Sequence, residues 1–167
     1  MRARSLALAL MLTVAPTATA TAAHAQEIGL AVGTKAPGAA VQTLDGKPAD
    51  LAQYIGKGPV LIEFWATWCE NCRALEPQIQ AVAKKYAGKL RLVGVAVSVN
   101  QSAQRVRTYQ QRHPFPGTLV FDKDGNATGA YDVPATSYIV ILDRTGKVVY
   151  SGLGAEQQLD AAVRKAL

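Results

Sequence analysis

The fold of this chain is decided by residues 60–73, which read VLIEFWATWCENCR. Residues 60–65 form an apolar run with the β-branched and aromatic content typical of a buried strand. A short turn then brings Cys69 and Cys72 to the start of an expected helix. Side chains at positions i and i+3 lie on one helical face, so these two sulfur atoms can bond to each other. A thiolate at a helix start also meets unpaired N–H groups and the positive end of the helix dipole, which lower its pKa, so the pattern predicts redox chemistry.

The same residues carry a family resemblance. Residues 64–72, FWATWCENC, resemble the active-site motif of the periplasmic TlpA/ResA/CcmG thiol-disulfide oxidoreductases, which are thioredoxin-like proteins of the redoxin or AhpC/TSA-like kind. A bare Cys-x-x-Cys is a weaker signal, because half of a zinc site has the same spacing. Residues 33–47 also resemble the lead-in of this family, so the resemblance covers about residues 33–165. It implies an α/β domain with the thioredoxin fold, in which a central mixed β-sheet carries helices on both faces.

The resemblance also implies a role for each residue of the motif. Cys69 is expected to be the more exposed nucleophile and Cys72 the resolving residue, and together they form the redox disulfide Cys69–Cys72. The expected active-site surround comprises Trp65, Trp68, Glu70, Asn71, Thr136 and Ser137. No organic cofactor and no bound metal are implied. The implied partners are protein disulfides or dithiols and a membrane electron donor of the DsbD or CcdA kind, and we expect the protein to be a monomer.

Glu63 is unusual because it lies within the apolar run of residues 60–65. Burying an ionised carboxylate is costly, so its pKa should be raised. Thioredoxins carry a buried acid near the second cysteine, six residues before the first, and Glu63 lies six residues before Cys69. The resemblance therefore implies that Glu63 moves a proton to or from Cys72 as the mixed disulfide resolves. The alternative is a carboxylate at the strand edge that simply reaches water.

Strand-like and helix-like segments alternate after the cysteines. Such alternation predicts parallel strands joined by right-handed crossovers. The expected helices are residues 73–88, 102–112 and 156–166, and the expected strands are residues 90–99, 119–122, 138–142 and 148–151.

The loop before residues 138–142 departs from the family pattern. In thioredoxins a cis-proline precedes this strand and faces the disulfide, where its backbone pairs with a substrate chain. Alignment from either side places Ser137 there, whereas Pro134 comes three residues earlier. Either Pro134 fills the role and the next strand is longer, or Thr136 and Ser137 replace the proline. A cis bond before a non-proline residue costs about 2.5–4 kcal/mol, so in the second case, which we favour, the Thr136–Ser137 bond should be trans.

Composition and the N-terminal residues predict the number of domains and the location of the protein. A chain of 167 residues with 49% hydrophobic content suits one domain with one core. Residues 1–25 are typical of a cleaved secretory signal, with Arg2 and Arg4 before a short apolar stretch and small residues at the cleavage site. The alternative is a membrane anchor, which needs about 20 apolar residues. We therefore predict export to the periplasm and a thioredoxin-like domain over residues 26–167.

Charge and cysteine number exclude several classes of function. Two cysteines cannot build a multi-bridge scaffold or an all-cysteine metal site within one chain. Removal of Arg2 and Arg4 lowers the Lys and Arg count from 18 to 16, against 12 Asp and Glu, for a net charge of about +4. This mild excess without a Lys or Arg cluster argues against nucleic acid as the partner.

The direction of electron flow and one rival function remain open at this point. Glu70 beside the nucleophile should raise the pKa of Cys69 and make the protein a reductant, for instance in cytochrome c maturation. Against this, Arg73 lies one turn along and Glu70 also suits the helix dipole. The rival is a copper or other metal carrier that uses Cys69, Cys72 and His113, a residue otherwise expected to be an exposed loop histidine. A peroxidase is a third option, which the Trp-Cys-x-x-Cys pattern weakens.

Overall fold

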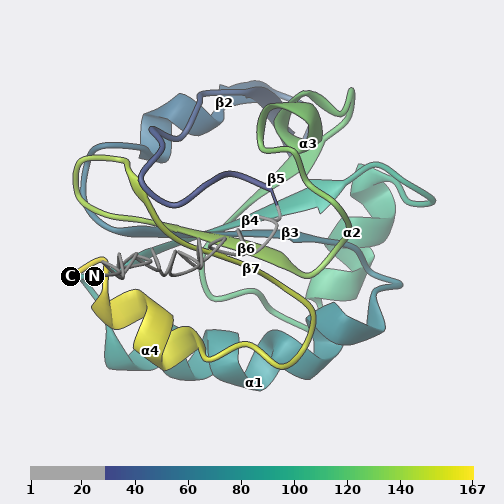
Figure 1. Ribbon diagram of the computed structural model, residues 1–167. Helices are drawn as coiled ribbons and strands as arrows, with labels where there is room; N and C mark the ends of the chain where they lie inside the picture. The colour runs from purple at the N-terminus through teal and green to yellow at the C-terminus, as the bar shows by residue number, and fades with distance from the viewer. Residues whose placement is uncertain (1–28) are drawn as a thin grey trace, which may run out of the picture.

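A computed structural model describes residues 29–167 (Figure 1), so the expected signal peptide lies outside the described residues. The strands form one mixed sheet of seven, in the order β2-β1-β5-β4-β3-β6-β7. They are β1 (Ala40–Thr43), β2 (Pro48–Asp50), β3 (Val60–Trp65), β4 (Arg91–Val97), β5 (Thr118–Asp122), β6 (Tyr138–Leu142) and β7 (Val148–Leu153). The helices are the 3-10 helix η1 (Leu51–Tyr54) and the α-helices α1 (Glu70–Lys85), α2 (Ala103–Gln110), α3 (Asn126–Ala130) and α4 (Leu159–Arg164).

Strand β3 lies in the interior of the sheet, as its apolar sequence predicts. It pairs in parallel with β4 and antiparallel with β6, and all six of its residues are buried. In this register Glu63 lies between Gly94 and Ile139. The end of β3 leads through residues 66–69 into α1, so the cysteine pair lies at the edge of the sheet where β3 ends.

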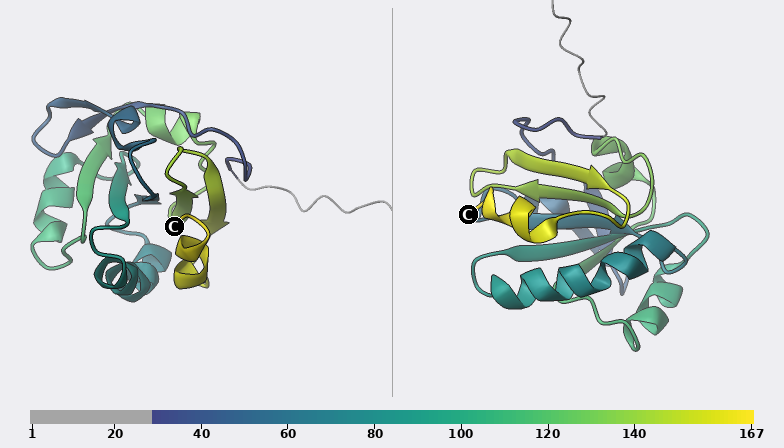
Figure 2. Two further views of the ribbon diagram at one scale, coloured as in Figure 1. Left: turned by 90° about the vertical axis from the view of Figure 1, so that its left-hand side faces the viewer. Right: turned by 60° about the horizontal axis from the view of Figure 1, so that its bottom comes forward.

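Helices cover both faces of the sheet, which confirms the expected α/β thioredoxin fold. Figures 1 and 2 show α1 and α4 side by side on one face, whereas η1 and α3 cover the opposite face. The alternation of side chains along β3 divides the core in the same way. Leu61 packs in the cluster with residues of α1 and α4, and Ile62 and Phe64 pack in the cluster with residues of η1, α2 and α3.

Several expected boundaries were wrong by a few residues. Helix α1 begins at Glu70 rather than at residue 73, because Cys69 caps it, and it ends at Lys85, before the left-handed turn at Gly88. Helix α4 begins at Leu159, three residues later than expected. The sequence reading missed β2 and α3 altogether. Both are very short, and α3 depends on the carboxylate of Asp122, which accepts the N–H groups of Ala127 and Thr128.

Candidate active site

The two cysteines share the first turn of α1 and are joined in a disulfide, with their Cα atoms 5.3 Å apart. Cys69 is the N-cap residue, and its Sγ accepts the backbone N–H of Cys72 at 3.0 Å. The carbonyl of Cys69 also accepts the N–H of Arg73 at 3.2 Å. An N-cap sulfur that accepts a helical N–H is stabilised as an anion by that donor and by the helix dipole. The geometry therefore favours a thiolate on Cys69 once the disulfide is reduced.

The expected contrast in exposure between the two cysteines is not observed. Cys69 is 6% exposed and Cys72 is 5% exposed, so neither residue projects freely into solvent. The two residues differ instead in their surroundings. Cys69 ends the loop of residues 66–69, which also carries the exposed Trp68, whereas Cys72 lines a partly open cavity.

This cavity connects Cys72 with the buried acid of β3. It has room for water over about 30 Å³, and its wall includes Glu63, Trp65 and Cys72 together with residues of α1, α2 and the loop 113–116. A single water molecule needs about 10–15 Å³ of such space. Glu63 and Cys72 therefore line one cavity that has room for a water molecule.

Glu63 is only 4% exposed, and its carboxyl group makes no hydrogen bond within residues 29–167. Burial raises its pKa from 4.5 to about 8, and the charge of Glu76 on α1 adds to the increase. The group is therefore mostly protonated at neutral pH, yet close enough to its pKa to lose the proton. The alternative of a strand-edge carboxylate in open water does not fit this degree of burial.

A polar cluster lines the same cavity. Glu76 accepts a hydrogen bond from the Tyr109 hydroxyl at 2.9 Å and lies 3.3 Å from Nδ1 of His113. The ring of His113 stacks on that of Tyr109, with centroids 4.3 Å apart. His113 was expected to be an exposed loop residue, and this was wrong, because Glu76 and Tyr109 hold it half-buried. The sequence gives no signal for this cluster, since its members come from segments 33 or more residues apart.

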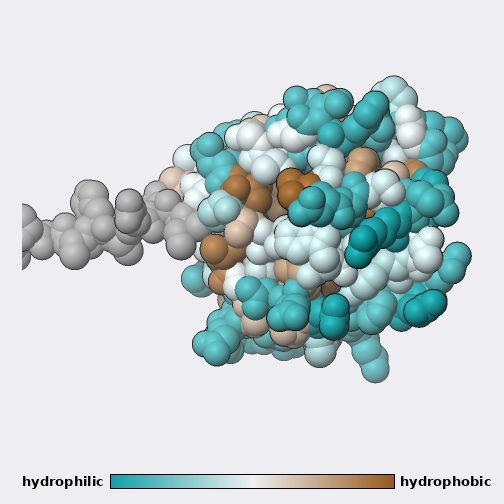
Figure 3. Space-filling view, turned by 90° about the vertical axis from the view of Figure 1, so that its right-hand side faces the viewer, coloured by the Kyte–Doolittle hydropathy of each residue, from teal (hydrophilic) through white to brown (hydrophobic). Residues whose placement is uncertain are grey.

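The two tryptophans of the motif have different environments. Trp68 is 40% exposed, and its Nε1 donates to the carbonyl of Val99 at 2.9 Å. Trp65 is buried beside Tyr109, and its Nε1 is a buried donor without a partner among the described residues. Figure 3 shows the side of the molecule on which α1 begins, where hydrophobic residues form separate patches between hydrophilic ones. Trp68 and Val99 are the exposed apolar residues nearest to the cysteines along the chain.

Ser137 lies beside the end of β3, directly before β6. Its N–H donates to the carbonyl of Phe64 at 2.9 Å, and its own carbonyl accepts Nε2 of the buried Gln157 at 3.0 Å. The residue is fully buried and has a φ of 65°, which a non-glycine side chain rarely adopts. Residues 29–167 contain no cis peptide bond, so the Thr136–Ser137 bond is trans as expected, and the bond before Pro134 is trans as well. Gln157, which fixes this loop, was not found from the sequence.

The structure also shows where the other expected active-site residues lie, and it bears on the metal-carrier hypothesis. Glu70 and Asn71 are exposed on the first turn of α1, and Thr136 is half-buried. Within the described part of the chain, no three His, Cys, Asp or Glu side chains are grouped so as to hold a metal ion. His113, the third ligand of the metal-carrier hypothesis, is engaged by Glu76 instead. Over the same range of residues, no helix has the length and apolar character needed to cross a membrane.

Comparison with known proteins agrees with this geometry. Residues 32–151 match the AhpC/TSA family. The chain belongs to this family. Thioredoxin-like protein YneN of Bacillus subtilis strain 168 is 33% identical over 142 residues, which cover 81% of this chain and 82% of that protein. Thiol-disulfide oxidoreductase ResA of Bacillus anthracis is 28% identical over 138 residues, covering 81% of this chain and 79% of that protein.

The solved structure of a disulfide oxidoreductase is also similar to this chain. It is that of a secreted Mycobacterium tuberculosis disulfide oxidoreductase homologous to E. coli DsbE, with a TM-score of 0.62 and 27% identity. The match covers 76% of this chain and 93% of that one. The family member described here is therefore a thioredoxin-like thiol-disulfide oxidoreductase, and its structure joins Cys69 and Cys72 in a disulfide at the start of α1.

Proposed function

We propose that the protein is an exported reductant that transfers two electrons from its Cys69–Cys72 dithiol to disulfides of partner proteins in the periplasm, in cytochrome c maturation or a similar assembly process. The observation that carries this proposal is the cysteine pair at the N-terminus of α1, whose inner member shares a cavity with the buried Glu63. The AhpC/TSA relatives named thiol-disulfide oxidoreductases support the same chemistry.

Cys69 starts the reaction. Its thiolate, stabilised by the N–H of Cys72 and by the helix dipole, attacks one sulfur of the partner disulfide. A bond forms between Cys69 Sγ and that sulfur, the partner's own S–S bond breaks, and the other partner sulfur leaves as a thiolate that takes a proton from water. The product is a mixed disulfide between the two proteins.

Cys72 completes the reaction with the help of Glu63. The ionised Glu63 carboxylate accepts the Cys72 thiol proton, and the new Cys72 thiolate attacks Cys69 Sγ. The intramolecular disulfide forms, and the second partner sulfur leaves as a thiolate. When a donor later reduces the protein, Cys72 leaves as a thiolate and takes the proton back from Glu63. A pKa of about 8 suits a group that both accepts and returns a proton near neutral pH.

Glu70 supports the reducing direction. It is exposed in the first turn of α1, next to Cys69, where its charge disfavours the Cys69 thiolate. Since a stabilised thiolate makes an oxidant, a less stable one shifts the protein towards a reductant. A continuous supply of electrons is then required, and a membrane thiol donor of the DsbD or CcdA kind would provide it to the monomeric enzyme.

Trapping the mixed disulfide tests the proposal. In a Cys72→Ala variant expressed with its own export signal, Cys69 attacks the partner but cannot be released, so the covalent complex should accumulate and the attached protein can be identified. A Cys69→Ala variant is the matched control and should trap nothing. No covalent complex with Cys72→Ala, or equal complexes with both variants, would contradict the assigned roles.

The direction of electron flow has a separate test. Equilibration of the purified protein with glutathione redox buffers should give a potential more negative than the value of about −180 mV typical of protein disulfide isomerase. A Glu70→Gln variant should lower the pKa of Cys69 and so move the potential in the oxidising direction. A higher pKa of Cys69 in this variant, or a native potential typical of a strong oxidant, contradicts the reducing role.

A further inference from the structure

A second depression lies next to the active-site loop, and the redox steps do not use it. It has a volume of about 310 Å³ and opens between the loop of residues 66–69 and α2. Its walls are formed by two arginines and by polar side chains. They are Thr67, Arg105, Thr108, Tyr109, Arg112 and His113.

Arg105 is fixed at the edge of this pocket by the active-site loop itself. Its Nε donates to Oγ1 of Thr67 at 3.1 Å, and the backbone N–H of Thr67 donates to Oε1 of Gln101 at 2.9 Å. The terminal nitrogens of the Arg105 guanidinium have no protein partner within residues 29–167. An arginine that is held through Nε presents its two terminal nitrogens as a planar fork, the arrangement that matches a carboxylate.

The charge in the pocket is not neutralised by the described part of the chain. The side chain of Arg112 forms no ion pair or hydrogen bond within it. Glu76 is not among the residues that line this pocket, and it is engaged by Tyr109 and His113. A neighbouring depression of about 300 Å³ shares Arg112 and His113 and adds both Arg73 and Glu76 to its wall. The pocket is therefore a positively charged site with free donors beside the disulfide.

We propose that the pocket of Thr67, Arg105 and Arg112 binds an Asp or Glu carboxylate of the partner polypeptide, close to the partner's reacting cysteine. This proposal rests on the proposed exchange with protein partners and specifies how they are selected. Thr67 precedes Cys69 by two residues, so their Cα atoms are at most about 7.6 Å apart. An extended partner chain advances about 3.3 Å per residue, which places the acidic residue about two to four positions from the partner's cysteine.

A polypeptide carboxylate fits this distance better than a small acidic thiol does. In a small thiol the carboxylate is held at one short separation of a few bonds from the sulfur, whereas a polypeptide can carry its acid at several separations from the cysteine. A partner chain can place its cysteine on the disulfide and its acid in the pocket at the same time. The effect of such an exposed, charge-assisted contact is modest, which suits a partner that must be released after each reaction.

Three matched peptide disulfides test the proposal with the full mature protein in its reduced form. Each is a symmetric disulfide of a short peptide with one cysteine. The first carries Glu three residues from the cysteine, the second carries Gln there, and the third carries Glu eight residues away. The rate constant for reduction of the first should exceed that of the second by about three- to tenfold. The third should react like the second, and the preference should fall at high salt.

Arginine variants test whether the preference for the acidic peptide arises in this pocket. Arg105→Gln and Arg112→Gln should each bring the ratio of the first two rates towards one. Arg107→Gln is the matched control, because it removes the same charge from the same helix. Its guanidinium instead bonds to Gln104 and to the carbonyl of Leu44, away from the pocket. Arg112→Gln removes no contact with the active-site loop, so the test does not depend on how well that loop tolerates Arg105→Gln.

Each of the other outcomes contradicts the proposal and points to a different explanation. Equal rates for the first two peptides show that no carboxylate is bound. Equal rates for the first and third peptides, or an equal loss of preference in Arg107→Gln, show only a long-range effect of charge. A larger preference for a small dicarboxylic disulfide over a neutral one of the same size, lost in Arg105→Gln, assigns the site to a small anion. Failure of all peptides to react contradicts the proposed function instead.

Discussion

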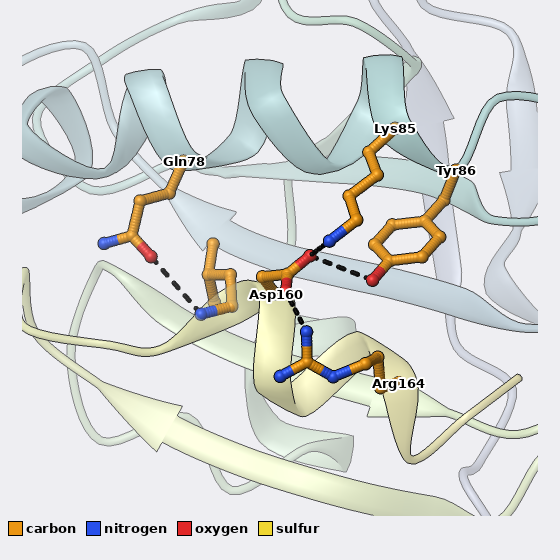
Figure 4. Close-up of polar contacts among 6 residues, drawn as sticks. Gln78, Lys85, Tyr86, Asp160 and Arg164 are labelled. Atoms are coloured by element: carbon orange, nitrogen blue, oxygen red, sulfur yellow. Dashed lines mark hydrogen bonds and ion pairs between the residues drawn. The ribbon is translucent and has the colours of Figure 1, made fainter.

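The two ends of helix α1 lie beside acidic side chains in opposite environments. At its C-terminal end, Lys85 and Tyr86 both reach the carboxylate of Asp160 on α4, at 2.6 and 2.9 Å, and Arg164 binds the same group (Figure 4). At its N-terminal end, the cavity beside Cys72 holds Glu63, which makes no hydrogen bond within the described chain. One end places a charged acid among three donors, whereas the other buries an acid without any.

This difference sets the structural contact at Asp160 apart from the proton-transfer role proposed for Glu63. A carboxylate with three donors is most stable when it is ionised and has little reason to exchange its proton near neutral pH. A carboxyl group buried without donors is most stable when it is neutral, so loss of its proton lowers the stability of the folded protein. The same burial that destabilises the ionised form gives Glu63 a pKa near the working pH of a proton-transfer group.

The two acids should therefore make stability depend on pH in opposite directions. The pKa of Glu63 is raised on folding, so the folded protein binds the proton more tightly and loses stability as pH increases from 4.5 to about 8. The pKa of Asp160 is lowered, first by its hydrogen bond from Lys85 and then by that from Tyr86. Its contribution is present above the ordinary value of 3.8 and is lost as pH falls through the lower folded-state pKa.

Replacement of Glu63 should have the largest effect. A Glu63→Gln variant has no ionisation to suppress, so at pH 8 it should be more stable than the native protein by about 4 kcal/mol, since one pKa unit corresponds to about 1.4 kcal/mol. Denaturant unfolding of the oxidised proteins at several pH values between 4.5 and 8 measures this. The gain should shrink towards the acid end, where the native carboxyl group is also neutral.

The control for this experiment is Glu70→Gln, which removes a similar charge from the exposed first turn of α1. Its stability should follow the native pH dependence between pH 4.5 and 8. If Glu63→Gln and the native protein lose stability in parallel over this range, Glu63 is not held neutral by burial, and the comparison of the two helix ends is wrong.

The same Glu63 substitution should slow catalysis while it increases stability. Gln cannot accept the Cys72 proton, so release of the mixed disulfide should slow by about 100-fold near pH 7, the lower end of what one positioned base contributes. Rapid-quench measurement of mixed-disulfide decay separates this step from its formation at Cys69, which should change little. Equal slowing of both steps would indicate a general disturbance of the site rather than a lost proton acceptor.

Glu76 should have a smaller effect through Glu63. Its charge adds to the increase in the pKa of Glu63, so Glu76→Gln should lower that pKa. Carboxyl ¹³C NMR of the oxidised protein can follow the titration of Glu63 directly, and the release step should reach its full rate at lower pH. Tyr109→Phe removes the hydrogen bond to Glu76 but no charge, so it serves as the control and should move the pKa of Glu63 less. An unchanged or higher pKa of Glu63 in Glu76→Gln contradicts the coupling.

Whether a feature could be predicted from the sequence depends on how far apart in the chain its interacting residues lie. The β3-loop-α1 unit is contiguous, so its apolar run, its cysteine spacing and the position of Glu63 are all visible in residues 60–73. The trans bond before Ser137 also followed from a local rule about non-proline residues. These features needed no knowledge of how distant segments meet.

The features that the sequence did not reveal depend on pairs far apart in the chain. Glu76 and His113 are 37 residues apart, and Thr67 and Arg105 are 38 apart. Their residue types are common on surfaces, and no periodicity marks them as partners. The near-equal burial of Cys69 and Cys72 is likewise a property of packing, since the helix-start position alone suggested that Cys69 is the more open of the two.

The C-terminal end of α1 should show the smallest effect, because Asp160 is partly exposed and its two charged partners, Lys85 and Arg164, are exposed. Asp160→Asn weakens the contacts with Lys85, Tyr86 and Arg164, and it should lower the melting temperature by no more than about 3 °C at neutral pH. The difference should diminish in 1 M salt and disappear as pH falls well below 3.8, where the native carboxylate also becomes neutral. Calorimetry at pH 7 and in acid measures both trends. A difference that grows in acid would mean that Asp160, like Glu63, is held neutral, and the two ends of α1 would then not differ in the way argued here.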